Sequence, residues 1–159
     1  MNWYAVITAS GKEESFCEYL QGEMKLHAIF PQAERYFRIQ KQDIYSLKPL
    51  SAGCVFVESQ HDVNTMVYML HQQQAFSIES CKQLSNDVVK ELFQMLNEKY
   101  VFLMSRGIIV NRKNYINEGP LQNKEQHIIK LNRHKRCAEL DFVLHDKHVL
   151  VGLEITEKR

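Results

Sequence analysis

The sequence predicts an α+β fold in two modules, an N-terminal sheet that carries helices and a small barrel of short strands after it. Up to residue 105, apolar residues at helical spacing alternate with β-branched runs, whereas the helical period disappears after residue 106. The charge divides at the same point. Residues 1–105 hold 9 basic and 12 acidic residues (net −3), and residues 106–159 hold 11 and 7 (net +4). The 159 residues can therefore fill two small, unlike modules.

The first part of the N-terminal module predicts a strand, a helix and further strands. The aromatic and β-branched run at residues 3–7 predicts a strand that ends near a serine-glycine turn. Residues 12–25 repeat apolar side chains at three-to-four spacing and carry two glutamates in the first turn, which predicts a helix. Prolines and a glycine interrupt residues 28–59, which we expect to form two or three strands.

The second part of this module predicts two more helices with a strand between them. Asp62 is a good cap for a helix over residues 62–72, and residues 76–79 resemble a strand. Ser85 caps a third helix that ends near residue 97. The predicted order of the module is therefore β-α-β-β-α-β-α.

The second module is expected to begin after a short hinge. The N-terminal module spans residues 1–105, the hinge lies at 106–113 with strands on both sides, and the small barrel occupies 114–159. Glycine, proline, asparagine and aspartate separate its short apolar runs, as expected of tight turns between strands.

Several classes of function are disfavoured by what the sequence lacks. No apolar run approaches the length that spans a bilayer, and no signal-peptide layout is present, so we expect a cytoplasmic protein without a membrane partner. The four cysteines have no CxxC spacing and are expected to be reduced. His145, His148 and Cys137 make a poor metal site, and no nucleophile or acid/base motif is recognisable. We therefore expect no cofactor, no metal and no enzymatic activity.

A basic segment at a predicted strand-to-strand turn is the strongest local signal. It holds four Lys and Arg side chains and one histidine in seven residues. Such side chains neutralise phosphates, and arginine and asparagine also bond to base edges in RNA. A solvated basic turn is the alternative explanation. The candidate RNA-binding residues are Lys130, Asn132, Arg133, His134, Lys135 and Arg136.

The strand predicted at residues 54–57 is apolar on both faces. Its period of two places Val55 and Val57 on one side and Cys54 and Phe56 on the other. With Ile7, the second pair forms a candidate apolar surface on a sheet whose other face carries helices. Such a surface favours a protein partner, and cover by loops or by the second module is equally compatible with the pattern.

Motifs in both halves resemble a known family. Trp3-Tyr4 with GKEE at 11–14, and PLSAGCVFV at 49–57, resemble the opening motifs of the NusG family of transcription elongation factors. Gly119-Pro120-Leu121 resembles the start of a KOW motif. NRHKR at 132–136 and GLEI at 152–155 are more similar to the LoaP-like antiterminator branch of that family.

The resemblance implies a fold and partners. The N-terminal domain would be an α/β sandwich with an antiparallel sheet, which binds the clamp helices of the largest RNA polymerase subunit through Ile7, Cys54 and Phe56. The KOW domain would be an SH3-like β-barrel that engages a nascent RNA hairpin through residues 130–136. Upstream or non-template DNA is a further candidate contact, and a monomer is expected.

The sequence departs from the family pattern at two places. Ser51, Ala52 and Cys54 replace two aromatic residues and a proline, so Phe56 is left as the main anchor and weaker binding to the clamp is expected. Asn123 and Gln126 stand where the KOW pattern has glycine. Asparagine tolerates a left-handed backbone better than glutamine, so the first turn of the barrel is expected to differ.

These observations favour two hypotheses. The first is a specialised antitermination factor that binds RNA polymerase with one domain and nascent RNA with the other, and promotes read-through of pauses and terminators. The second is a general NusG-like elongation factor whose KOW domain recruits a protein, such as a termination helicase or a ribosomal protein. A small RNA-processing enzyme is a third class, which no acid/base constellation supports.

Overall fold

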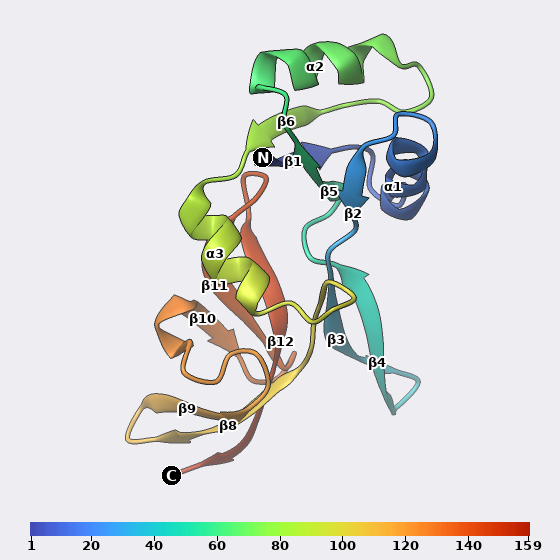
Figure 1. Ribbon diagram of the computed structural model, residues 1–159. Helices are drawn as coiled ribbons and strands as arrows, with labels where there is room; N and C mark the ends of the chain where they lie inside the picture. The colour runs from blue at the N-terminus through green and yellow to red at the C-terminus, as the bar shows by residue number, and fades with distance from the viewer.

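A computed structural model describes residues 1–159 as two packed domains with three α-helices and three β-sheets (Figure 1). The N-terminal domain is built on a four-stranded antiparallel sheet in the order β2-β5-β1-β6. Its strands are β1 (Asn2–Ile7), β2 (His27–Ile29), β5 (Cys54–Ser59) and β6 (Ser80–Gln83). The predicted mixture of helices and strands is confirmed.

The helices lie where their capping residues predict them. Helix α2 (Val63–Gln72) begins after Asp62, whose carboxylate accepts a hydrogen bond from the Thr65 backbone N–H at 2.8 Å. Helix α3 (Asn86–Gln94) begins after Ser85, whose hydroxyl accepts from the Val88 N–H at 3.2 Å. These bonds satisfy amide groups that have no partner within the helix. Helix α1 (Glu13–Gly22) ends before residue 25, because the chain turns there with a φ of +55°.

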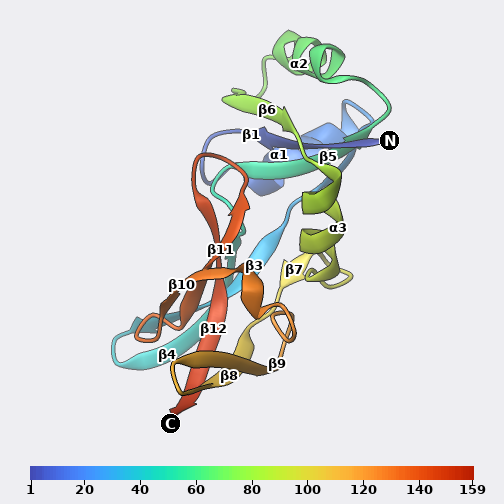
Figure 2. The ribbon, with the colours of Figure 1, turned by 90° about the vertical axis from the view of Figure 1, so that its left-hand side faces the viewer.

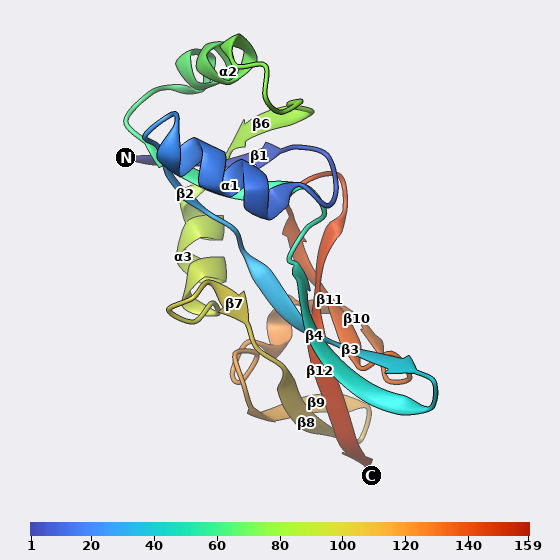
Figure 3. The same cartoon turned by 90° about the vertical axis from the view of Figure 1, so that its right-hand side faces the viewer.

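Helices α1 and α2 cover one face of the four-stranded sheet (Figure 3). Val55 and Val57 point into this core with Phe16 from α1 and Met66 and Leu70 from α2. Neither these helices nor α3 is long and apolar enough to cross a membrane.

Residues 28–59 contain four strands rather than two or three. Besides β2 and β5, the segment forms a long hairpin of β3 (Gln32–Ile39) and β4 (Gln42–Pro49), which projects from the rest of the domain (Figure 3). Strand β7 (Val101–Phe102) pairs in parallel with β3, but only at Gln32 and Ala33. The hairpin is exposed on much of its surface, so its sequence shows no strong apolar alternation.

Residues 76–79 do not form the predicted strand, because β6 begins at Ser80. The ring of Phe76 packs instead against Phe16 and Tyr19 of α1, with centroid distances of 5.2 and 5.4 Å. The side chain of Gln73 also bonds to both backbone groups of Phe76. These contacts hold residues 76–79 as a loop over the helix.

The C-terminal domain is a five-stranded sheet in the order β10-β11-β12-β8-β9. The expected hinge at residues 106–113 is structured instead. It lies in β8, in the turn at residues 111–112 and at the start of β9, because its apolar side chains pack into the domain. The strands are β8 (Ser105–Val110), β9 (Lys113–Glu118), β10 (Ile128–Asn132), β11 (Cys137–Val143) and β12 (His148–Lys158).

The loop after β9 shows how the chain accommodates the missing glycines. Gly119 and Asn123 have φ values of +97° and +63°, so asparagine takes the left-handed position expected of it. Gln126 has no positive φ and lies in a 3₁₀ helix, η1 (Glu125–His127). The turn therefore avoids placing glutamine in a left-handed conformation.

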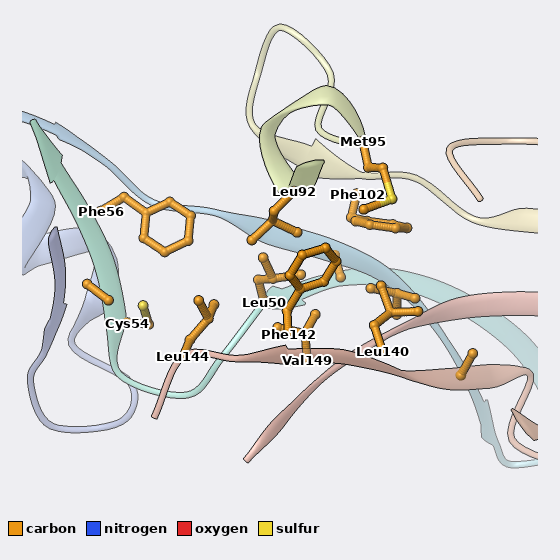
Figure 4. Close-up of a cluster of buried hydrophobic side chains, with 14 of the residues drawn as sticks. Leu50, Cys54, Phe56, Leu92, Met95, Phe102, Leu140, Phe142, Leu144 and Val149 are labelled. Atoms are coloured by element: carbon orange, nitrogen blue, oxygen red, sulfur yellow. The ribbon is translucent and has the colours of Figure 1, made fainter. Parts of the chain in front are cut away.

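The two domains share one hydrophobic core (Figure 4). This cluster combines the second face of the N-terminal sheet, the apolar side of α3, and residues of β11, β12 and the turn between them. Figures 1 and 2 show β11 and β12 running up beside α3 towards the four-stranded sheet. The C-terminal domain is thus docked on the N-terminal domain.

Candidate nucleic-acid interface

Ile7, Cys54 and Phe56 are brought together by the pairing of two strands. Ile7 of β1 lies opposite Cys54 of β5, and Phe56 follows two residues along on the same face. All three are at most 1% exposed. Burial, with a smaller contribution from Glu13, raises the pKa of the Cys54 thiol to about 12. The surface predicted from the period of two exists, but it is covered in this arrangement.

The cover comes from helix α3 and from the C-terminal domain. The ring of Phe93 stacks on Phe56 with a centroid distance of 5.4 Å and an interplanar angle of 17°. Leu144, in the turn after β11, lies beside Cys54 in Figure 4, and Phe142 lies near Leu92. The sequence left a protein partner, loops and the second module as explanations of this surface. In the docked arrangement the second module covers it together with helix α3.

Polar contacts between the domains surround this apolar cover. At one side, Glu91 of α3 forms an ion pair with Lys124 at 3.1 Å and contacts His127 at 3.5 Å, and His127 also contacts Asp141 at 2.9 Å. At the tip of the β11–β12 turn, His145 lies 3.7 Å from Glu79. The hydrogen bond from Lys124 lowers the pKa of the Glu91 carboxyl.

The lowered pKa predicts an acid-sensitive domain contact. A carboxyl group whose pKa is lower in the folded protein than in the unfolded chain stabilises the fold at pH values above its ordinary pKa of 4.5. This stabilisation is lost as the pH falls through the lowered pKa of the folded protein. We therefore expect Glu91→Gln to lower the urea midpoint slightly at neutral pH, and to match the parent protein at a pH below that range. If the urea midpoint of Glu91→Gln stays equally far below that of the parent protein in acid, then packing, and not charge, explains the lower stability.

The basic segment forms a tight turn between β10 and β11. The side-chain oxygen of Asn132 accepts a hydrogen bond from the Lys135 backbone N–H at 2.9 Å, and the Arg136 N–H donates to the Arg133 carbonyl at 3.2 Å. Arg136 closes the turn with a φ of +51°. Asn132 therefore builds the turn, since its side-chain oxygen bonds to the backbone.

Arg136 points back to the N-terminal domain rather than to solvent. Its guanidinium lies 4.0 Å from the centre of the Tyr36 ring and donates a hydrogen bond of 2.6 Å to the Tyr45 hydroxyl. It also forms ion pairs with Glu154 at 3.3 Å and Asp43 at 3.8 Å. A hydrogen bond donated to Asp43 raises the pKa of the Tyr36 phenol. Arg136 thus ties the turn to the β3–β4 hairpin.

The remaining basic residues of the segment are free of such ties. Arg133, His134 and Lys135 are exposed at the turn, and Lys130 is exposed on β10. None of the four forms an ion pair. The structure therefore divides the six predicted residues into four available side chains and two, Asn132 and Arg136, that shape and anchor the turn.

A groove of about 650 Å³ separates this turn from the β3–β4 hairpin. The hairpin side of the groove carries no function predicted from the sequence. The available signal was the run Arg35-Tyr36-Phe37-Arg38, which interleaves basic and aromatic residues as nucleic-acid-binding surfaces do. The groove is lined by Arg35, Tyr36, Phe37, Arg38, Arg133, His134, Lys135 and Arg136.

No group of three or more His, Cys, Asp or Glu side chains is arranged to hold a metal ion. The three residues that the sequence disfavours as a metal site are dispersed: Cys137 is buried at the start of β11, His145 lies in the following turn and His148 begins β12.

A comparison with known proteins gives one family. The model of the NusG family, described as transcription termination factor nusG, matches residues 1–104. This range covers the N-terminal domain and ends just before β8. No curated protein matches the chain.

Proposed function

The chain belongs to the NusG family of transcription factors, and we propose that it is a specialised antitermination factor of the LoaP-like kind. Proteins of this family act in transcription elongation and termination, bind RNA polymerase and are not enzymes. In the proposed function, the N-terminal domain binds the polymerase clamp helices, and the C-terminal domain binds an element of the nascent RNA. The factor would then promote read-through of pauses and terminators.

The observation that carries the RNA half of this proposal is the basic turn. Arg133 and Lys135 are exposed and have no acidic partner, while Arg136 and Asn132 hold the turn in shape. A rigid turn loses less conformational freedom when it binds, so its cations are prepared for phosphate contacts.

The polymerase half uses the surface of Ile7, Cys54 and Phe56. Because helix α3 and the docked C-terminal domain both cover it, polymerase binding through this surface requires the β11–β12 turn to move away and the Phe93 ring of α3 to leave Phe56. Two linked contacts, one to polymerase and one to RNA, would raise the effective concentration of each. Selective recruitment then needs no great affinity at either surface.

The RNA assignment is tested by titration of the full-length protein against a labelled RNA stem-loop at increasing salt. We expect Arg133→Gln with Lys135→Gln to weaken binding at least about tenfold and to reduce the salt slope by about two, one for each lost phosphate contact. Lys90→Gln is the matched control, because Lys90 is an exposed cation on α3 without an ion pair.

Two results would contradict RNA binding at this turn. One is a double variant that binds as tightly as the parent protein. The other is a DNA stem-loop of the same sequence that competes equally, because specific RNA sites distinguish the 2′-hydroxyl. In the cell, sequencing of crosslinked RNA should give a single leader element rather than a genome-wide spread.

A general NusG-like factor that recruits a protein is the second candidate. Exposed apolar side chains on the C-terminal domain favour it, since Tyr115, Ile129 and Val143 are each about half exposed. Exposed tyrosine is enriched among the residues that anchor protein interfaces, and exposed apolar side chains beside it add contact area. An RNA titration that is indifferent to salt and to the turn variant would favour this candidate.

A further inference from the structure

The groove beside the basic turn has walls from both domains. The C-terminal wall is the turn of residues 133–136, and the N-terminal wall is the stretch 35–38 of β3. Figures 2 and 3 show the β3–β4 hairpin projecting alongside the strands of the C-terminal domain. The bond from Arg136 to Tyr45 holds the two walls together. The groove therefore exists only while the domains are docked.

The lining of this groove is strongly positive. It contains five Lys and Arg side chains and one histidine, and no carboxylate. The nearby acids are partly engaged, because Glu154 and Asp43 are ion-paired with Arg136. Three of the lining cations, Arg35, Arg133 and Lys135, have no ion pair. A groove with such cations in its walls favours a polyanion, since each phosphate that enters releases condensed counterions and meets charges already in place.

The N-terminal wall holds donors that the protein leaves unused. The buried Nε of Arg35 has no hydrogen-bond partner, and a buried unpaired donor is costly. Arg38 is exposed and is paired only with Asp43 at the long distance of 3.8 Å. Beyond Ala33, moreover, β3 has no strand on the edge opposite β4. The packing of the protein alone therefore does not explain why these arginine donors and this strand edge lack close partners.

We infer that the RNA backbone is held between the two domains, with Arg35 and Arg38 of the N-terminal hairpin binding phosphates of the same RNA that contacts Arg133 and Lys135. This inference rests on the proposed RNA-binding function and extends it to a second domain. The aromatic ring of Phe37, half-buried between Arg35 and Lys48, stiffens the wall through contacts of 5.9 and 5.2 Å with their cationic groups.

This site has a consequence for the domain contact. RNA that contacts both walls binds only the docked arrangement, so it stabilises that arrangement by mass action. The groove and the covered apolar surface lie at opposite ends of β11, since the turn of residues 133–136 precedes the strand and Leu144 follows it. The RNA therefore occupies a place that is separate from the surface of Ile7, Cys54 and Phe56.

The test compares hairpin variants of the full-length protein in titrations with the same labelled RNA stem-loop. Arg35→Gln with Arg38→Gln is expected to weaken binding roughly tenfold or more and to lower the salt slope by one to two. Lys41→Gln is the matched control, because Lys41 is an exposed cation at the tip of the same hairpin and does not line the groove. The control is expected to bind as the parent protein does.

The outcomes separate this inference from the proposed function. If the turn variant at Arg133 and Lys135 loses RNA binding while the variant at Arg35 and Arg38 behaves like Lys41→Gln, the cross-domain site is overturned and the proposed function stands. If neither variant affects binding, both are overturned. Loss in both variants, with circular dichroism spectra that match the parent protein, supports the cross-domain site.

Discussion

Gly152→Ala should destabilise the docked protein by about 1–3 kcal/mol, the usual cost of inserting a methyl group into a filled core. A Cβ at Gly152 would clash with the sulfur of Met104 and would lie 2.6 Å from the backbone carbonyl oxygen of Glu34. The carbonyl belongs to β3 and cannot rotate away. Strand β12 must therefore shift away from β3, and urea denaturation would report the loss of stability as a lower midpoint.

Gly22→Ala is the matched control for this prediction. Gly22 ends helix α1, and a Cβ there has no heavy atom within 4 Å. Alanine is the better residue in a helix by roughly 0.5–1 kcal/mol, so this variant should be neutral or slightly more stable. Equal changes in the urea midpoint for both variants would show that the close crossing of β12 and β3 does not restrict the residue at position 152.

The second large effect is expected from Leu144→Asp, which should increase the capture of RNA polymerase. Leu144 is buried in the turn that covers Cys54 and Phe56 (Figure 4). A carboxylate there weakens the cover by about 2 kcal/mol or more, the cost of losing a buried leucine. The fraction of open protein then rises by more than tenfold, and the apparent affinity rises with it. A pull-down with purified core polymerase measures the change.

Val143→Asp is the control for the polymerase experiment, because Val143 precedes Leu144 and is 52% exposed. It introduces the same charge without touching the cover. Phe56 itself makes a poor test, since removing a fully buried phenylalanine costs about 3–5 kcal/mol and would disturb the fold. Capture that is no greater with Leu144→Asp than with Val143→Asp would contradict polymerase binding at this surface.

Sequence patterns predicted those features of the N-terminal fold that depend on residues close together in the sequence. Asp62 and Ser85 predicted the starts of two helices, because the side-chain oxygen of a capping residue bonds to a backbone N–H only three residues further along. The alternation of residues 54–57 predicted two apolar faces on β5. The same alternation does not say what covers each face, since helices, loops, a second domain and a partner protein all bury apolar atoms equally well.

The contacts that distant residues make at the candidate site could not be predicted from the local sequence either. The segment 130–136 was predicted from its density of charge, but its division into free and engaged residues depends on distant parts of the chain. Arg136 contacts Tyr36 and Tyr45, which are 100 and 91 residues away in sequence. Arg35 and Arg38 were missed because each is an ordinary surface residue until the C-terminal turn is placed opposite it.

The sheet of the N-terminal domain also determines how the molecule can open. Strands β1 and β5 contribute side chains to both hydrophobic clusters, so the division between the cores runs through the plane of the sheet and not along the domain boundary. Departure of the C-terminal domain exposes part of only one side of this plane, where α3 still packs on Phe56, while α1 and α2 keep the other side closed. The sheet can therefore behave as a persistent cooperative unit, on which the second core assembles and disassembles as a separate unit.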